Sequence, residues 1–190
     1  MSPRGDKRAQ LLAKAVDDLA EHGIADLSLA PMAERLGTSK RMLIYYFGSR
    51  DALIAEAIAA SRPDVSDLFH DVRDTADLEK AAWVLWEAIT RGRQRRPIRI
   101  LFQVLSLAPT QPERYAALAA DAVRAMVEPL VPVYRALGFG ELEARSRASL
   151  LISGLRGLCQ DRIVTGDDER IEAAADVLIR AAAAGENRKS

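Results

Sequence analysis

The chain has 190 residues, of which 49% are hydrophobic, and its 27 basic and 27 acidic side chains give a formal net charge of zero. This apolar content suffices for a buried core in one or two domains and excludes a disordered chain. A single cysteine permits no intrachain disulfide. The sequence contains no apolar run of membrane-spanning length, and its first ten residues lack the apolar core of a signal peptide. We therefore expect a globular, cytoplasmic protein that does not contact membranes.

The first predicted element is an amphipathic helix over residues 7–22. Asp6 is a possible cap, and Gly23 is the residue at which the helix should end. Apolar side chains recur on one face at helical spacing: Leu11, Leu12, Ala15, Val16, Leu19 and Ala20. Such a helix can support the segment that follows it.

The next segment is typical of two short helices joined by a glycine turn. Ser28 can cap the first of them, and Pro31 lies in its first turn, where no intrahelical hydrogen bond is lost. Gly37 supplies the left-handed conformation that ends this helix. The apolar stripe consists of Leu29, Met32, Ala33 and Leu36. The spacing fits a helix-turn-helix, and it fits an ordinary hairpin of two helices equally well.

The second of these helices, about residues 40–46, begins with two cations. Thr38 or Ser39 can cap it, and Lys40 and Arg41 occupy its first turn. The positive end of the helix dipole disfavours cations there, so an approaching polyanion would relieve the repulsion. A recognition helix presents its N-terminal residues to the major groove of DNA, and this pattern therefore favours DNA as the partner.

Basic residues are concentrated near these helices although the net charge is zero. The chain carries four cations and no acid from Arg35 to Arg50. Arg4, Lys7 and Arg8 form a second basic cluster. A basic patch on an otherwise balanced surface is enough for a protein that touches DNA with one end.

A further helix capped by Ser49 should continue the apolar stripe until Pro63 breaks it, so we place a DNA-binding domain at residues 1–62. Glycine, proline and polar breaks divide residues 63–190 into helices, with no alternating strand pattern. The expected helices are 75–95, 97–107, 112–137, 141–164 and 168–184. The fold class is therefore all-α, and residues 63–190 are expected to form a second domain, in which the candidates for ligand binding and dimerisation described below lie.

The last two helices predict how the protein assembles. The final helix is apolar on nearly all sides, so it must be buried on more than one side, and a terminal helix has few intrachain neighbours to do this. We expect a homodimer closed by a four-helix bundle, two helices from each subunit. The interface candidates are Ser149, Ser153, Gly157, Ala174, Leu178 and Ala181. The alternative is an alanine-rich core within one chain.

Aromatic residues with a few polar groups suit a mostly apolar small-molecule cavity, and the second domain offers candidates for lining one. The candidates are Trp83, Trp86, Phe102, Gln103, Tyr115, Met126, Tyr134, Arg156 and Cys159. Pro129 and Pro132 should kink the helix that forms one wall. For each aromatic residue the alternative is ordinary core packing. Arg156 needs a partner, which is a ligand anion, an acid across the dimer or solvent.

Two other chemistries are considered and set aside. Asp67, His70, Asp71 and Asp74 share a helical face, but without a second histidine nearby we favour a solvated acidic linker over a metal site. An enzyme would need Cys159 as a nucleophile with a histidine base, and no local triad, phosphate-binding loop or zinc cluster accompanies it. We expect no catalysis, no cofactor and no metal.

The segment LSLAPMAERLGTSKRMLIYYFGSRDALI resembles the DNA-binding segment of TetR-family transcriptional regulators. The shared features are LG-x-S, a leucine, two aromatics followed by phenylalanine, a short turn, and a basic residue before a leucine. The resemblance implies an N-terminal three-helix helix-turn-helix domain, a C-terminal helical bundle and a homodimer that represses from a palindromic DNA operator. It also implies a small effector in the bundle that tilts the DNA-binding domains out of register. The alternative within this class is a regulator without an effector.

Position within the motif assigns the individual roles. The resemblance places Lys40, Arg41 and Met42 at base edges, where Arg41 can bind a guanine through two hydrogen bonds. It also implies phosphate contacts for six further residues: Ser28, Thr38, Ser39, Tyr45, Tyr46 and Arg50. Arg41 and Ile44 depart from the commoner pattern, which has a small residue or proline and then a tyrosine at these positions. The operator sequence therefore cannot be taken from relatives.

Overall fold

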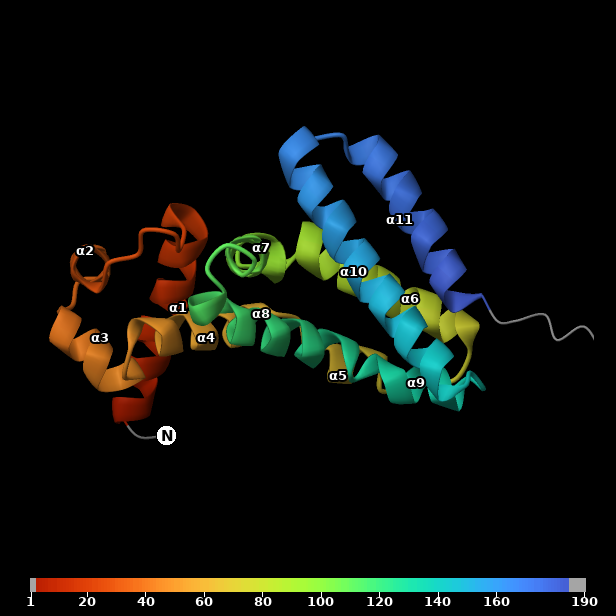
Figure 1. The fold of residues 1–190 in the computed structure, drawn as a ribbon, viewed down its shortest axis with the longest axis horizontal. Helices are drawn as coiled ribbons and strands as arrows, with labels where there is room; N and C mark the ends of the chain where they lie inside the picture. The colour runs from red at the N-terminus through yellow and green to blue at the C-terminus, as the bar shows by residue number, and fades with distance from the viewer. Residues whose placement is uncertain (1–2, 185–190) are drawn as a thin grey trace, which may run out of the picture. The chain divides into compact units, whose positions relative to one another are not determined.

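The structure, a computed structural model, describes the backbone of residues 3–184 and the side chains from residue 6 onward (Figure 1). This part of the chain folds into α helices and one 3₁₀ turn without strands, which confirms the all-α fold. It divides into two compact units, one from residues up to 62 together with 93–122, the other from 63–92 together with residues from 123 onward. The predicted domain boundary at residue 62 coincides with one of these divisions. The segment 93–122, however, packs with the N-terminal unit.

The N-terminal unit is a three-helix core with further helices against it. Helix α1 packs against α2, α4 and α7, while α3 packs against α2 and α4. The elements are α1 (Pro3–His22), α2 (Leu29–Arg35), α3 (Lys40–Phe47), α4 (Arg50–Ser61), η1 (Arg93–Arg95), α7 (Ile98–Leu107) and the first part of α8 (Pro112–Val127). The stripe predicted for the first helix of the turn is buried: Leu29, Met32, Ala33 and Leu36. This packing fixes α3 against the rest of the unit.

Most of the predicted caps and turns of this unit are present. The hydroxyl of Ser39 accepts a hydrogen bond from the Met42 amide at 3.2 Å, which selects Ser39 over Thr38 as the cap of α3. Gly37 has φ +67°, a conformation that favours glycine, and ends α2 as predicted. Two expectations were wrong: Ser28 stands at the cap position of α2 without a side-chain cap bond, and Asp6 lies inside α1.

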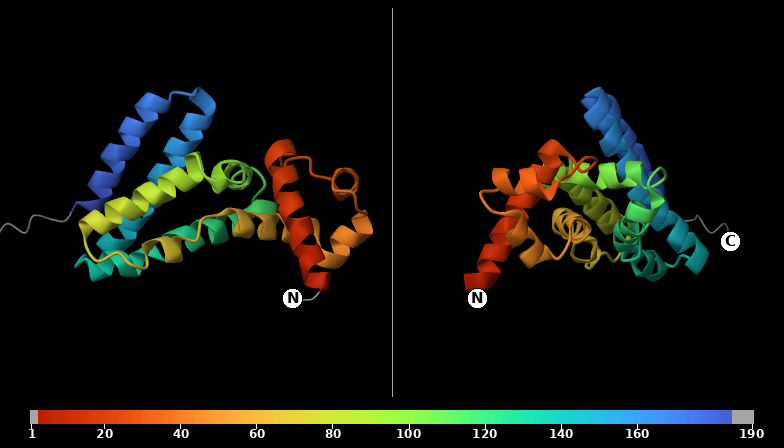
Figure 2. Two further views of the ribbon diagram at one scale, coloured as in Figure 1. Left: turned by 180° about the vertical axis from the view of Figure 1, so that it is seen from behind. Right: turned by 60° about the vertical axis from the view of Figure 1, so that its left-hand side comes forward.

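The C-terminal unit is built around a hairpin formed by its last two helices, α10 and α11. These helices lie side by side in the views of Figures 1 and 2. Helix α6 packs against both helices of this hairpin, and α9 packs against its first helix. The elements are α5 (Val65–Phe69), α6 (Thr75–Thr90), α9 (Leu130–Ala136), α10 (Glu141–Thr165) and α11 (Asp168–Ala183). Gly166, at φ +68°, ends α10, and the Asp167 side chain caps α11.

Three elements differ from the predicted ranges. The helix expected over 75–95 stops at Thr90, because Gly92 folds back on the end of its own helix. The helix expected over 112–137 is two helices, α8 and α9, with Pro129 between them; proline has no amide hydrogen with which to continue the helix. The acidic linker contains the short helix α5, capped by the Asp64 side chain. None of the helices within residues 3–184 is both long and apolar enough to cross a membrane.

Candidate DNA-binding interface

Helix α3 presents a polar and charged outer face. Leu43 and Phe47 are buried beneath it, while Lys40 and Arg41 are exposed at its first turn. Ile44 and Tyr45 lie on the outer side with 43% and 55% of their surfaces exposed. Within the described part of the chain, Lys40 and Arg41 form no ion pair, so both charges remain available to a polyanion.

The other predicted contact residues, on α3 and in the turn before it, are mostly half-buried. Thr38, Met42 and Tyr46 are half-buried, and the Ser39 hydroxyl is engaged by its own helix. The Tyr46 ring packs edge-on against the ring of Tyr45, with centroids 5.1 Å apart. The contacts of these residues with base edges and phosphates stay predictions.

Arg50 requires a correction, because its guanidinium group points into the protein. Nε donates to the Leu27 carbonyl at 2.9 Å, and Nη2 donates to the Ile24 carbonyl at 2.6 Å and to the Tyr115 hydroxyl at 3.1 Å. Only 13% of its side chain is exposed. We therefore no longer assign Arg50 a phosphate contact. The sequence motif places a cation at the start of α4, but it does not show which way that cation points.

Two further cations of the predicted basic region are also held by acids. Nε and Nη2 of Arg35 donate to the buried carboxylate of Asp18 at 2.5 and 2.7 Å, and this bonding raises the pKa of Arg35. The Arg8 guanidinium binds Glu56 at 2.6 Å. The side chain of Arg4 lies outside the described residues. The outward charge of this motif therefore rests on Lys40 and Arg41.

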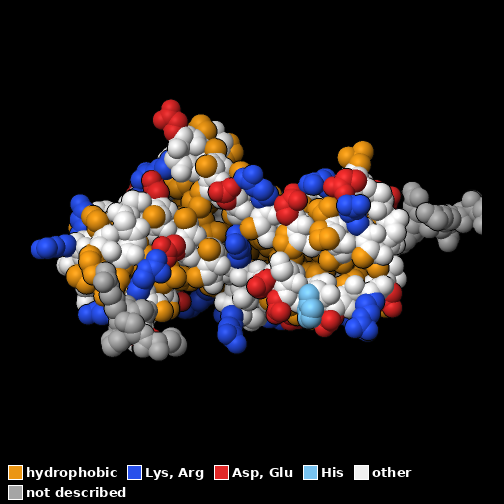
Figure 3. Space-filling view, turned by 90° about the horizontal axis from the view of Figure 1, so that it is seen from below, with side chains coloured by type: hydrophobic (Ala, Val, Ile, Leu, Met, Phe, Trp, Pro, Cys, Tyr) orange, Lys and Arg blue, Asp and Glu red, His pale blue; other side chains and the backbone are white. Residues whose placement is uncertain are grey.

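The surface elsewhere carries both signs of charge. Figure 3 shows basic and acidic side chains interspersed with hydrophobic ones over one face of the molecule, as expected for a chain with zero net charge. Among residues 6–184 no group of three or more histidine, cysteine or acidic side chains is arranged to hold a metal ion.

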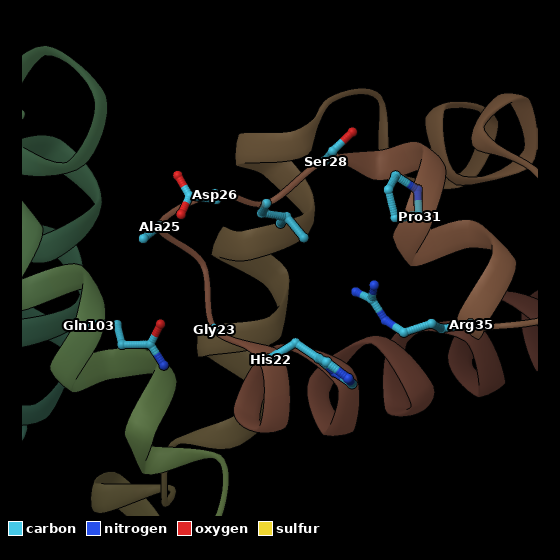
Figure 4. A pocket seen from close by; sticks show the side chains of 9 residues that line it. His22, Gly23, Ala25, Asp26, Ser28, Pro31, Arg35 and Gln103 are labelled. Carbon is cyan, nitrogen blue, oxygen red and sulfur yellow. The ribbon is translucent and has the colours of Figure 1, made fainter.

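A pocket of about 300 Å³ lies beside the loop between α1 and α2 (Figure 4). Its lining includes Gly23, Ser28 and Arg35 of the helix-turn-helix region and Gln103 of α7. The Gln103 side-chain oxygen accepts a hydrogen bond from the Ile24 amide at 2.8 Å. Gln103 was predicted to contact an effector in the C-terminal domain, whereas the structure places it in the N-terminal unit against this loop.

The remaining effector candidates are divided between the two units. In the N-terminal unit Phe102 is buried, and the hydroxyl of buried Tyr115 accepts from Arg50. In the C-terminal unit the indole of buried Trp86 donates to Glu172 at 3.1 Å. The Cys159 thiol donates to the Ile89 carbonyl at 3.7 Å, and burial raises its pKa to about 11. Trp86, Tyr115 and Cys159 thus have structural partners, although nothing tests contact with a ligand.

Two buried polar atoms of the C-terminal unit have no hydrogen-bond partner among the described residues. One is the hydroxyl of Tyr134, whose ring packs edge-on against Phe139 and whose pKa is raised by burial. The other is Nη1 of Arg156. Nη2 of the same guanidinium donates to the Ser153 hydroxyl at 3.2 Å, and burial lowers the pKa of Arg156. Nη1 of Arg156 is therefore in contact neither with solvent nor with a hydrogen-bond acceptor among the described residues.

An open apolar groove of about 760 Å³ runs along the α10–α11 hairpin. It brings together five of the six predicted interface residues, and the sixth, Ser149, is exposed on α10 outside the lining. The lining residues are Leu150, Ser153, Gly154, Gly157, Leu158, Ala173, Ala174, Val177, Leu178 and Ala181. Leu150 and Val177 keep 51% and 68% of their surfaces exposed. A side chain at Gly154 would collide with Leu178, so glycine permits the close approach of the two helices.

This arrangement is similar to that of known transcriptional regulators. Residues 11–57 match the family described as bacterial regulatory proteins, tetR family. The HTH-type transcriptional regulator BetI of Rhizobium meliloti is 27% identical over 174 residues, which cover 91% of this chain and 74% of that protein.

Two solved structures share the fold over nearly the whole chain. A TetR transcriptional regulator from Legionella pneumophila superposes with a TM-score of 0.72 at 17% identity, covering 90% of this chain and 95% of the other. The multidrug binding protein EbrR, complexed with proflavin, gives a TM-score of 0.58 at 21% identity, covering 92% and 98%. Residues 11–57 thus match the tetR family of bacterial regulatory proteins, and the chain as a whole shares the fold of solved regulators of this kind.

Proposed function

We propose that the protein is a dimeric repressor that binds a palindromic DNA operator through α3 and is released by a small, mostly apolar ligand. The observation that carries this proposal is the outer face of α3, where Lys40 and Arg41 are exposed without a counter-ion in the described chain. A cytoplasmic location is part of the same proposal, because the operator would be genomic DNA.

The contacts with DNA fall into two classes. Lys40, Arg41 and Met42 read base edges, and Arg41 has the fork geometry that pairs with a guanine. Phosphate contacts from Ser28, Thr38, Ser39, Tyr45 and Tyr46 position the helix without reading sequence. Ile44 is exposed where relatives commonly carry tyrosine, so its contact is apolar, for example with a thymine methyl group.

Dimerisation is supported by the apolar groove on α10 and α11. Its exposed leucine and valine side chains would be costly in contact with water, and its small residues allow another pair of helices to approach closely. A two-fold dimer presents two copies of α3 to two inverted half-sites at a fixed separation. Changing the angle between subunits then alters affinity without changing any base contact.

An effector is supported by the likeness to EbrR, a multidrug binding protein, and by the unsatisfied polar atoms of the C-terminal unit. Seven of the eight acidic residues from Glu141 to Asp176 have a basic partner, Glu169 being the exception in the described chain. We therefore favour an anionic group of the effector, rather than an acid of the second subunit, as the partner of Arg156. By linkage, DNA weakens effector binding by the same factor as the effector weakens DNA binding.

Selection of duplexes from a random pool, followed by gel-shift titration, tests this function. The protein should enrich an inverted repeat and bind it far more tightly than a scrambled duplex of the same composition at physiological salt. Lys40→Ala combined with Arg41→Ala should abolish the enrichment, whereas Arg95→Ala, an exposed cation of η1, is the matched control. Equal affinity for all duplexes at low and high salt would contradict the proposal.

A further inference from the structure

The loop between α1 and α2 is held by side chains that lie far from it in the sequence. The amide of Ile24 donates to Gln103 on α7 at 2.8 Å, and its carbonyl accepts from Arg50 on α4 at 2.6 Å. Arg50 also holds the Leu27 carbonyl, two residues before α2 begins. Both backbone groups of one loop residue are therefore fixed by side chains of two other helices.

The first part of α8 completes this arrangement. Arg50 donates to the hydroxyl of Tyr115, whose side chain is only 1% exposed. That hydroxyl is a second acceptor for Nη2, the nitrogen that also donates to the Ile24 carbonyl, and adds to the hold of Leu27 and Asp51 on the same guanidinium group. Buried backbone groups are costly when unpaired, so the loop conformation depends on Gln103 and Arg50, with Tyr115 as a further partner of Arg50. The Leu27 amide also donates to the Ile24 carbonyl, at 3.3 Å.

The loop has little freedom to compensate if one of these bonds is lost. Gly23 has φ +83°, and a Cβ there would lie 2.9 Å from the Gln103 side-chain oxygen. The chain passes from this glycine to α2 in only five residues, and α2 packs directly against α3. A displacement of the loop is therefore transmitted to the helix pair that carries Lys40 and Arg41.

We propose that Gln103 and Tyr115 are positioning residues for DNA recognition, acting through Ile24 and Arg50 to set the placement of α2 and α3. Neither residue belongs to the helix-turn-helix segment, and neither contacts DNA in this proposal. Through these two residues, helices α7 and α8 influence the placement of α3. The inference rests on the proposed function as far as its operator readout is concerned, but its structural part stands independently.

Matched substitutions at residue 103 separate this role from general stability. Gln103→Met keeps the volume of the side chain but removes the acceptor for the Ile24 amide, whereas Gln103→Glu retains an acceptor oxygen. Tyr115→Phe removes only the hydroxyl that Arg50 donates to. Ile100→Val, a buried change on the same helix α7, is a control that lowers stability without touching the loop.

Two measurements are made on each variant: amide hydrogen exchange of Ile24 in the free protein, and affinity for the selected operator duplex. Gln103→Met should accelerate exchange at Ile24 and weaken operator binding by about tenfold, the factor expected for one lost hydrogen bond. Gln103→Glu should retain wild-type behaviour, and Tyr115→Phe should weaken operator binding without accelerating exchange as strongly as Gln103→Met. Ile100→Val should lower the melting temperature while leaving both readouts unchanged.

The outcomes distinguish the two proposals. If Gln103→Met leaves exchange at Ile24 unchanged, or weakens operator binding only as much as Ile100→Val does, the positioning role is overturned. If the wild-type protein selects no duplex, the proposed function fails, and the exchange measurement alone decides whether Gln103 and Tyr115 hold the loop.

Discussion

The two units of the protein differ in how they treat buried polar groups. In the N-terminal unit the buried carboxylate of Asp18 and the inward guanidinium of Arg50 each have several partners at hydrogen-bond distance. In the C-terminal unit Tyr134 and Arg156 each bury a polar atom without a partner among the described residues. A fully paired network holds one geometry, whereas an unpaired buried group favours the arrival of something that satisfies it. This difference fits the proposed function, in which the N-terminal unit holds the DNA-binding helices in one geometry and the C-terminal unit receives a ligand.

The exposed faces of the two units differ in the same sense. Helix α3 exposes cations, which water solvates well, while the α10–α11 hairpin exposes leucine and valine along its groove. The first surface suits a partner whose binding affinity depends on salt concentration and on DNA sequence. The second suits a permanent contact with another apolar surface.

The largest expected effect is on the groove. Val177→Arg should dissociate the dimer and weaken operator binding by about 100-fold or more, because an unpaired charge buried at an interface costs several kcal/mol. Val84→Arg on α6 is the matched control, since Val84 is also an exposed valine of the same unit. Sedimentation velocity measures the oligomer. A dimer that survives Val177→Arg would place the subunit contact elsewhere.

Removal of the Arg50 side chain should mainly destabilise the N-terminal unit. Arg50→Met should lower the free energy of unfolding by about 2 to 3 kcal/mol, because a charged donor to four acceptors is lost from a largely buried site. Urea denaturation measures this, with Lys40→Met, an exposed cation at the start of α3, as the control. The slope of operator affinity against salt should not change for Arg50→Met; a flatter slope would restore Arg50 as a phosphate contact.

The hairpin and Arg50 show what the sequence could and could not predict. The ends of α1 and α2 followed from glycine positions, and the starts of α3 and α4 followed from serine caps. The apolar hairpin followed from its periodicity, because these signals are all local. The direction of Arg50 could not be predicted, since its acceptors are backbone carbonyls of a distant loop. Nor could the role of Gln103, whose partner Ile24 lies 79 positions away.

A smaller effect is expected for the reading residue. Arg41→Ala should cost about 1 to 3 kcal/mol of operator binding and relax the preference at one base position. Affinities for the operator and for single-base variants of it measure this. An equal loss on specific and random duplexes would show that Arg41 contacts a phosphate instead.

Substitution of Arg156 in the C-terminal unit should change the free energy of unfolding in the opposite direction to Arg50→Met. Arg156→Met should raise the free energy of unfolding of the ligand-free protein by about 1 kcal/mol, since a half-buried guanidinium group with one buried, unpaired nitrogen is replaced by an apolar side chain of similar length. Chemical denaturation measures it, with Arg180→Met, an exposed arginine of α11 paired with Asp176, as the control. Destabilisation by Arg156→Met would show that Nη1 also has a partner in the free protein, besides the bond from Nη2 to Ser153.

The smallest effect concerns Cys159. Because burial raises its pKa to about 11, only roughly one thiol in a thousand is ionised at pH 8, and alkylation by iodoacetamide should be very slow in the folded protein. The unfolded thiol ionises near its ordinary pKa of 9.0, so the stability that Cys159 contributes should fall as pH rises from about 9 to 11. Rapid alkylation at pH 8 without denaturant would contradict this burial.

The N-terminal unit is made of two stretches of chain separated by α5 and α6. During synthesis the helix-turn-helix segment therefore leaves the ribosome well before Gln103 and Tyr115 have been made. Until they arrive, the Ile24 amide has no side-chain acceptor and Arg50 lacks one of its partners. Helices α2 and α3 of the nascent chain should thus reach their final placement late. A fragment that ends at residue 62 would keep the DNA-binding motif but lose the bonds from Gln103 and Tyr115.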